Sequence, residues 1–182
     1  AMRYDLKVLA SWIETGSKVL DLGCGRGELL SHLMAEKEVR GAGIELNEDK
    51  AAQAVARGVS VIQGDINREL VDYPDESFDY AILSQTLQQV YEPLHLIRKI
   101  LRVARMGVVS FPNFGHWRVR LSLLGTGKAP VTRELPFSWH DTPNIRVITL
   151  KDFDFMCREN GFAILRQGAI STFHRKEKGR MV

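Results

Sequence analysis

The most informative stretch of the chain is Val19-Leu20-Asp21-Leu22-Gly23-Cys24-Gly25-Arg26-Gly27. Its first half continues an apolar, β-compatible run that begins at Lys18, and its second half is a turn built on three glycines. Residues 28–34 follow with leucines at helical spacing. The order strand, tight turn, helix puts the glycines where a ligand can approach the backbone closely, because no Cβ fills that space.

The same alternation of strand and helix continues along the chain. Further strands are predicted at residues 41–46, 59–63, 78–84 and 107–111, and helices at 3–14, 48–56 and 93–104. This alternation predicts a Rossmann-like, doubly wound α/β fold with a mostly parallel sheet.

The pattern changes after residue 113. Residues 114–145 contain three prolines and two of the three tryptophans with little periodicity, which indicates an insertion or lid within a single domain of residues 1–182. A helix over 150–160 is predicted next, with Thr149 at its start. Strands at 162–166 and 169–173 are separated by two residues, so they predict an antiparallel hairpin that completes a seven-stranded sheet.

The composition of the chain limits the kinds of molecule that it is expected to bind. The chain has 182 residues, with 25 Lys and Arg against 22 Asp and Glu, and these charges are spread too evenly to indicate a nucleic-acid groove. No apolar run approaches the ~20 residues of a membrane span, and no secretion signal opens the sequence. Two cysteines give neither a disulfide framework nor a metal site. We expect a cytoplasmic protein with no nucleic-acid, membrane or metal binding.

The glycine turn resembles the acidic-x-Gly-x-Gly-x-Gly loop of the class I S-adenosylmethionine-dependent methyltransferases. The resemblance implies that Asp21 receives the ammonium of the methionine moiety, Glu45 accepts from both ribose hydroxyls, and Asp65 accepts from the adenine amino group, with Ile66 as an apolar wall. The hairpin at the end of the sheet is a further feature of this fold. The residues expected around S-adenosylmethionine or S-adenosylhomocysteine are Asp21, Gly23, Cys24, Gly25, Gly27, Glu45, Leu46, Asp65, Ile66 and Ser84.

Three other interpretations of the sequence motifs are disfavoured. A dinucleotide-binding loop needs a third glycine where this chain has Glu28, whose carboxylate would repel a pyrophosphate. A nucleophilic role for Cys24 needs a nearby base that the sequence does not provide, so a small filler residue is expected there. Residues 84–89 lack the Asn/Asp-Pro-Pro-aromatic motif that clamps a flipped base, which disfavours nucleic-acid base methylation.

Several longer stretches resemble the methionine biosynthesis protein MetW family. They are residues 19–30, Ser84-Gln85-Thr86-Leu87-Gln88-Gln89-Val90, Ser110-Phe111-Pro112-Asn113-Phe114-Gly115-His116-Trp117 and Leu135-Pro136-Phe137-Ser138-Trp139-His140-Asp141-Thr142-Pro143-Asn144-Ile145. The resemblance implies a bacterial cytoplasmic protein that works with a homoserine O-acyltransferase. The chain has no Gly-x-Ser-x-Gly elbow, so the acylation itself would belong to the partner.

Two functions therefore stay open. One is an accessory subunit that binds the acyltransferase, with the apolar and basic stretch Trp117-Arg118-Val119-Arg120-Leu121 at the interface. The other is an S-adenosylmethionine-dependent methyltransferase that acts on a small molecule, for which His116 or His140 is a candidate base and no catalytic residue is assigned. The fold alone does not choose between them.

Overall fold

The computed structural model describes residues 2–132 and 135–170. The chain divides into two compact units, unit 1 with residues 1–111 and unit 2 with residues 112–182. Each unit is described by itself.

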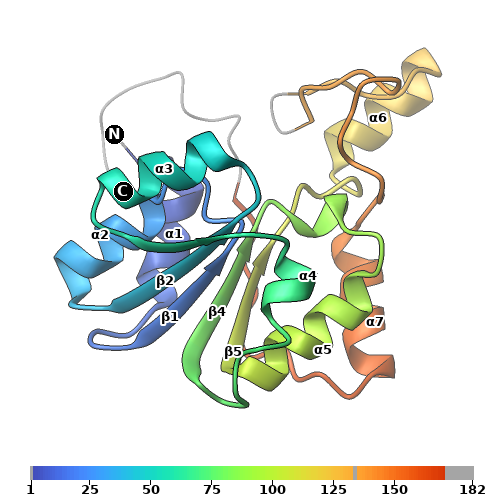
Figure 1. The fold of residues 1–182 in the computed structure, drawn as a ribbon. Helices are drawn as coiled ribbons and strands as arrows, with labels where there is room; N and C mark the ends of the chain where they lie inside the picture. The colour runs from blue at the N-terminus through green and yellow to red at the C-terminus, as the bar shows by residue number, and fades with distance from the viewer. Residues whose placement is uncertain (1, 133–134, 171–182) are drawn as a thin grey trace, which may run out of the picture. The chain divides into compact units, whose positions relative to one another are not determined.

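Unit 1 is built on a parallel sheet of five strands in the order β3-β2-β1-β4-β5 (Figure 1). The strands are β1 (Lys18–Leu22), β2 (Arg40–Glu45), β3 (Ser60–Gln63), β4 (Phe78–Ser84) and β5 (Ala104–Ser110). Every neighbouring pair of strands runs parallel. The doubly wound α/β prediction is confirmed, although β5 begins three residues earlier than expected because α5 passes into it without a turn.

Helices cover both faces of this sheet. They are α1 (Tyr4–Trp12), α2 (Glu28–Lys37), α3 (Glu48–Ala56), α4 (Ile66–Glu69), the short 3-10 helix η1 (Leu87–Gln89) and α5 (Pro93–Val103). Leu30 of α2 and Ala54 of α3 pack in one apolar cluster with Val19 and Ile82 of the sheet. Alternate strand residues such as Leu83, which is fully buried, point to the opposite face, where α5 packs against β4 and β5.

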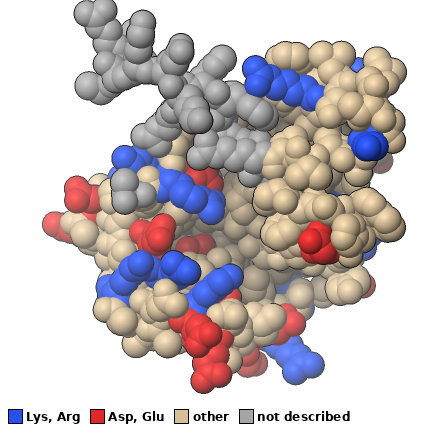
Figure 2. All heavy atoms as spheres, turned by 90° about the horizontal axis from the view of Figure 1, so that it is seen from above, with Lys and Arg blue, Asp and Glu red and all other residues tan. Residues whose placement is uncertain are grey.

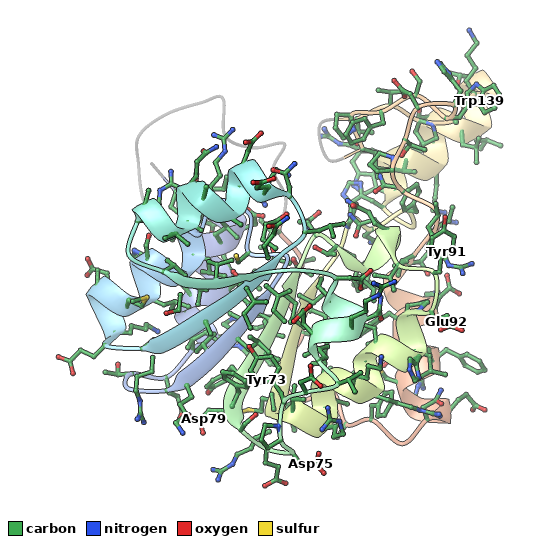
Figure 3. All side chains as sticks on the ribbon, viewed as in Figure 1. Tyr73, Asp75, Asp79, Tyr91, Glu92 and Trp139 are labelled. Carbon is green, nitrogen blue, oxygen red and sulfur yellow. The ribbon has the colours of Figure 1, made fainter. Side chains whose placement is uncertain are left out.

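The strand order fixes where a ligand site is expected. The chain first adds strands on one side of β1 and then crosses to β4 on the other side, so the reversal falls between β1 and β4. In open α/β sheets, ligands bind outside the carboxyl ends of the strands at such a reversal. Asp79 lies at the other end of the strands, near their amino ends. There its carboxylate accepts a hydrogen bond from the Lys18 backbone N–H at 2.8 Å (Figure 3).

Unit 2 contains two helices among its described residues, α6 (Trp117–Thr126) and α7 (Leu150–Glu159). The predicted capping of α7 is confirmed, because the Thr149 hydroxyl accepts a hydrogen bond from the Asp152 N–H at 3.1 Å. The Asn113 side chain accepts from the N–H of Gly115 at 2.9 Å and so fixes the turn before α6. The stretch expected to be irregular thus contains a helix, and its placement as an insertion in a single domain stays a prediction.

The predicted seven strands and C-terminal hairpin are wrong for the described residues, whose sheet has five strands. Residues 162–170 form no strand, and Leu165 is left 78% exposed. A strand exists only where a neighbour completes its hydrogen bonds, and the segment 162–166 pairs with none within the described part of the chain. Residues 171–173 of the expected second strand lie outside the described residues.

Within residues 2–132 and 135–170, no helix has the length and apolar character needed to cross a membrane.

Candidate functional site

The glycine turn after β1 is fastened to the end of β2 by its backbone. The N–H groups of Gly23 and Cys24 both donate to the Ile44 carbonyl, at 2.8 and 3.1 Å, and the Gly27 N–H donates to the Cys24 carbonyl at 3.0 Å. All three glycines of the turn have positive φ angles, 74° at Gly23, 57° at Gly25 and 73° at Gly27. The turn therefore depends on residues without a Cβ.

The last two glycines of the turn serve different purposes. A Cβ on Gly27 would lie 2.9 Å from the Cβ of Ala54, so this glycine lets the start of α2 approach α3. A Cβ on Gly25 would meet nothing within 4 Å. Packing therefore explains Gly27, whereas Gly25 faces open space that a ligand can occupy.

Two buried carboxylates lie beside this turn at the carboxyl ends of β1 and β2. Asp21 is 3% exposed and Glu45 is 8% exposed. Burial, reinforced by the charge of Glu45, raises the pKa of Asp21 to about 7. Glu45 uses one oxygen to accept from the Gly25 N–H at 2.8 Å and the other to accept from the Asn47 N–H at 2.9 Å. Glu45 thus ties the glycine turn to the start of α3.

Cys24 fits the filler role expected from the sequence. Its side chain is buried, and a Cβ on Gly43 of β2 would lie 2.5 Å from its Sγ. Burial, followed by the charges of Asp21 and Glu45, raises the pKa of the thiol to about 12. The reactive thiolate is therefore strongly disfavoured at neutral pH.

Three of the residues expected to contact the ligand follow β2 and β3, and they differ in exposure and in contacts. They are Leu46, Asp65 and Ile66. Asp65 is exposed and caps α4, with one carboxylate oxygen accepting from the Asn67 N–H at 2.7 Å. Ile66 lies against the glycine turn, since its Cδ1 is 3.9 Å from the Cβ position of Gly23. Leu46 is 69% exposed. The backbone brings β3 to this edge, because the Gly64 N–H donates to the Glu45 carbonyl at 3.0 Å.

The end of β4 closes the other side of the turn. The Ser84 hydroxyl lies 3.2 Å from the Ser110 hydroxyl at the end of β5. Thr86 reaches further, because its Oγ1 is 3.0 Å from the Cβ position of Gly23. Sequence reasoning did not include Thr86 in the site. Its nearness to the glycine turn depends on strand order, which the local sequence does not specify.

The assembled edge can bind a ligand that carries a cation and hydroxyl groups. Two carboxylates supply acceptors, the glycine turn supplies open space, and Ile66 supplies an apolar contact. The described residues form no group of three or more His, Cys, Asp or Glu side chains able to hold a metal.

This fold defines a class I methyltransferase-like protein. A methyltransferase described as S-adenosylmethionine dependent from Archaeoglobus fulgidus superimposes with a TM-score of 0.68 and 20% identity, over 87% of this chain and 66% of that one. Another from Aquifex aeolicus gives a TM-score of 0.62 and 18% identity over 88% and 80%. Within this class the chain belongs to the methionine biosynthesis protein MetW family, whose sequence profile matches residues 3–182.

Two curated relatives are longer than this chain, and the first of them carries the name of the family. The bifunctional methionine biosynthesis protein MetXA/MetW of Rhodopirellula baltica is 36% identical over 160 residues, which are 83% of this chain and 26% of that protein. The ubiquinone biosynthesis O-methyltransferase of Pseudomonas entomophila is 31% identical over 142 residues, 72% of this chain and 61% of that protein. The chain thus spans about a quarter of the first relative and about three fifths of the second.

Proposed function

We propose that this protein binds S-adenosylmethionine or S-adenosylhomocysteine and acts in the bacterial cytoplasm as the partner or activator of a homoserine O-acyltransferase in methionine biosynthesis. The observation that carries the nucleotide part is the pair of buried carboxylates, Asp21 and Glu45, beside a glycine turn that opens onto free space.

Each chemical group of S-adenosylmethionine has a suitable residue at this site. Asp21 has a raised pKa because it is buried without a cation, and the ligand ammonium would restore its ionised form. Glu45 is suited to the two ribose hydroxyls, since a carboxylate has lone pairs beyond those that Gly25 and Asn47 use. Asp65 keeps a second oxygen for the adenine amino group, and Ile66 would contact the adenine ring.

Replacing Glu45 by alanine tests the ribose assignment. We expect Glu45→Ala to weaken binding of S-adenosylhomocysteine by about 1 to 3 kcal/mol, because it removes a charged acceptor shared by two hydroxyls. The measurement is calorimetric titration, with Glu48→Ala, an exposed acid in the first turn of α3, as the matched control. Equal affinities for Glu45→Ala and the unchanged protein would show that β2 does not contact the ribose.

The partner part is supported by the relative from Rhodopirellula baltica, whose name joins MetXA to MetW in one bifunctional protein. Two domains that are joined in one protein of one organism can interact as separate proteins in another organism. The acyltransferase then supplies the acylation chemistry, and this chain supplies the nucleotide site.

Helix α6 offers the apolar surface that such a partner needs. Val119 is its one buried residue, and Trp117, Leu121, Leu123 and Leu124 are all more than half exposed. Trp139, which follows α6 in unit 2, is 79% exposed and lies at the outside of the unit (Figure 3). Exposed apolar patches of this kind mark protein interfaces.

The charge around α6 favours an acidic surface on the partner. Residues 112–149 contain five Lys and Arg against two Asp and Glu, a formal charge of +3. Figure 2 shows one face of the molecule with Lys and Arg in blue and Asp and Glu in red. We assign α6 to the acyltransferase contact, with apolar anchors at its centre and cations at its rim.

A charge placed at Leu124, an exposed apolar residue of α6, tests this assignment. We expect Leu124→Glu to lower the affinity for the homoserine O-acyltransferase at least about tenfold, because a carboxylate would be buried in an apolar contact. Co-purification and surface plasmon resonance measure the effect. Ser122→Glu adds the same charge at an exposed polar position of α6 and is the control. Equal weakening by both variants would contradict a specific apolar contact at Leu124.

The second candidate is an S-adenosylmethionine-dependent methyltransferase acting on a small molecule. It is supported by the match to proteins named ubiquinone biosynthesis O-methyltransferase. Formation of S-adenosylhomocysteine in a screen of small-molecule acceptors would favour it over the accessory role.

A further inference from the structure

A cavity lies at the amino end of the sheet, at the opposite end of the strands from the proposed nucleotide site. Its volume is about 260 Å³, and Asp79, which lies beside it, marks this end of β4 in Figure 3. The cavity is formed within unit 1 by the turn between α1 and β1 and by the first residues of β4 and β5. Pockets for drug-sized ligands have roughly 300–1,000 Å³, so this cavity suits a smaller molecule than a nucleotide.

The turn between α1 and β1 forms one wall of the cavity and is fixed by hydrogen bonds. The Ser17 hydroxyl donates to the Glu14 carbonyl at 2.6 Å, and the Gly16 N–H donates to the Lys37 carbonyl at 2.8 Å. Gly16 permits the turn because its φ angle is 76°, a conformation that residues with a Cβ rarely adopt. This wall is therefore in place without a ligand, and Glu14 stands at its start.

Tyr80 of β4 borders the cavity although its side chain is only 4% exposed. It lies in register between Val19 of β1 and Met106 of β5, so its position is set by the sheet. Burial raises the pKa of Tyr80, and the charges of Glu14 and Asp79 raise it further. The hydroxyl therefore stays protonated at neutral pH and can donate a hydrogen bond.

Groups of opposite charge stand on the two sides of Tyr80. Asp79 uses one carboxylate oxygen to accept from the Lys18 N–H at 2.8 Å, and its other oxygen lies 4.0 Å from Nη1 of Arg105. A separation of 4.0 Å is longer than a hydrogen bond, and the Arg105 side chain is 68% exposed, so its N–H donors can still pair with a ligand. Glu14 supplies a second carboxylate on the β1 side of β4, and Arg105 lies on the β5 side.

This set of groups matches a small molecule that carries both charges. Carboxylates pair with an ammonium, and a guanidinium together with a hydroxyl donor pairs with a carboxylate. A ligand with only a positive charge would be repelled by Arg105, and a ligand with only a negative charge would be repelled by Glu14 and Asp79. A zwitterion satisfies both sides of the cavity.

We propose that this cavity binds a free α-amino acid, whose carboxylate accepts from Arg105 and Tyr80 and whose ammonium donates to Glu14. The inference goes beyond the proposed function, because it concerns a second site at the other end of the sheet and does not depend on nucleotide binding.

The test uses L-methionine as the probe, since the chain belongs to a family of methionine biosynthesis proteins. Two analogues each lack one charge. Methioninol keeps the ammonium and has a hydroxymethyl group in place of the carboxylate, and the α-hydroxy acid analogue of methionine keeps the carboxylate and lacks the ammonium. We expect calorimetric titration of the wild-type protein to show binding of L-methionine and at least about tenfold weaker binding of each analogue.

Substitutions on the two sides of the cavity should have different effects. We expect Arg105→Met to lower the affinity for L-methionine at least about tenfold and to leave that for methioninol unchanged. Glu14→Gln should weaken binding of L-methionine and leave that of the α-hydroxy acid unchanged. Arg40→Met, the same change as at Arg105 but at an exposed position at the amino end of β2, is the control and should alter no affinity.

Three results would overturn the proposal. They are the absence of L-methionine binding at millimolar concentration, equal losses in Arg105→Met and Arg40→Met, and binding at the glycine turn. Nitrogen-15 spectra of the wild-type protein locate the ligand, because L-methionine should shift the backbone amides of Gly16 and Arg105 and leave that of Gly25 unchanged. Shifts at Gly16 in a protein that binds no S-adenosylhomocysteine would support this inference and contradict the proposed function.

Discussion

Replacing Asp21 by asparagine is expected to weaken S-adenosylmethionine binding by about 10- to 100-fold, because a buried hydrogen bond to a charged group contributes roughly 1.5–3 kcal/mol. Asparagine keeps the shape of the side chain and removes the charge that attracts the ammonium. Calorimetric titration at pH 8 measures the loss. In the wild-type protein, affinity should also rise as the pH increases through about 7, the pKa of Asp21, and the variant should lack this rise.

The same substitution should stabilise the ligand-free protein. The pKa of Asp21 in the folded state, about 7, lies above the ordinary aspartate value of 3.8, so the folded state binds the proton more tightly than the unfolded state. Stability therefore falls as the pH rises from about 4 to 7, and above pH 7 the folded chain holds a buried carboxylate. We expect the Tm of Asp21→Asn to exceed that of the wild type at pH 8, by a margin that shrinks toward pH 4.

Opposite effects on stability and binding would identify Asp21 as a residue kept for its ligand. Asp79→Asn, the same change at the amino end of β4, is the control and should leave nucleotide affinity unchanged. A fall in both Tm and affinity on Asp21→Asn would instead mean that the carboxylate supports the fold.

Adding a methyl group at Gly27 is expected to cause the largest loss of stability in the glycine turn. Gly27→Ala places a Cβ at a φ of 73° and 2.9 Å from the Cβ of Ala54. The left-handed conformation costs about 1–2 kcal/mol and overpacking about 1–3 kcal/mol, so the free energy of unfolding should fall by about 2–5 kcal/mol. Urea denaturation measures the change.

Gly58→Ala separates the two contributions. Gly58 has a φ of 81°, but a Cβ there would meet nothing within 4 Å, so only the conformational cost of about 1–2 kcal/mol is expected. Equal losses at Gly27 and Gly58 would show that α2 and α3 do not pack as closely as the structure indicates.

Local sequence patterns predicted most of unit 1. The stretch Lys18–Leu22 and the stretch Phe78–Ser84 were predicted with their observed bounds, because buried parallel strands bounded by turn residues leave a clear pattern. Helix α6 was missed because its apolar residues, at positions 117, 119, 121, 123 and 124, do not all keep the helical spacing of a single buried stripe, and one of its ten residues is buried. The C-terminal hairpin was predicted from two β-compatible runs separated by two residues, and such local patterns do not specify whether a pairing strand is present.

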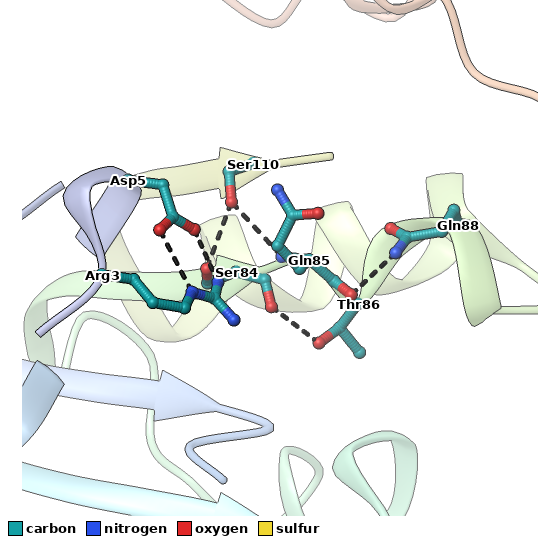
Figure 4. Close-up of polar contacts among 7 residues, drawn as sticks. All are labelled: Arg3, Asp5, Ser84, Gln85, Thr86, Gln88 and Ser110. Carbon is teal, nitrogen blue, oxygen red and sulfur yellow. Dashed lines mark hydrogen bonds and ion pairs between the residues drawn. The ribbon is translucent and has the colours of Figure 1, made fainter. Parts of the chain in front are cut away.

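The sequence predicted the acidic residues and glycines of the candidate site. It did not predict which residues of the loop after β4 contact the glycine turn. Asp21 and Glu45 end successive strands, and parallel strands bring their carboxyl ends to one edge, so their proximity followed from the fold class. Thr86 belongs to a loop whose position depends on the left-handed Gln85 and on pairing with Ser110 (Figure 4). Contacts across such a distance in the chain leave no local pattern.

The most direct test is calorimetric titration of the purified chain with S-adenosylmethionine and S-adenosylhomocysteine, alone and with the homoserine O-acyltransferase. We expect binding to the chain alone and an altered affinity in the complex, because a subunit that couples ligand binding to partner binding must bind the ligand differently in its free and partner-bound states. Absence of binding in both conditions would contradict the account and leave the fold as a scaffold without a nucleotide site.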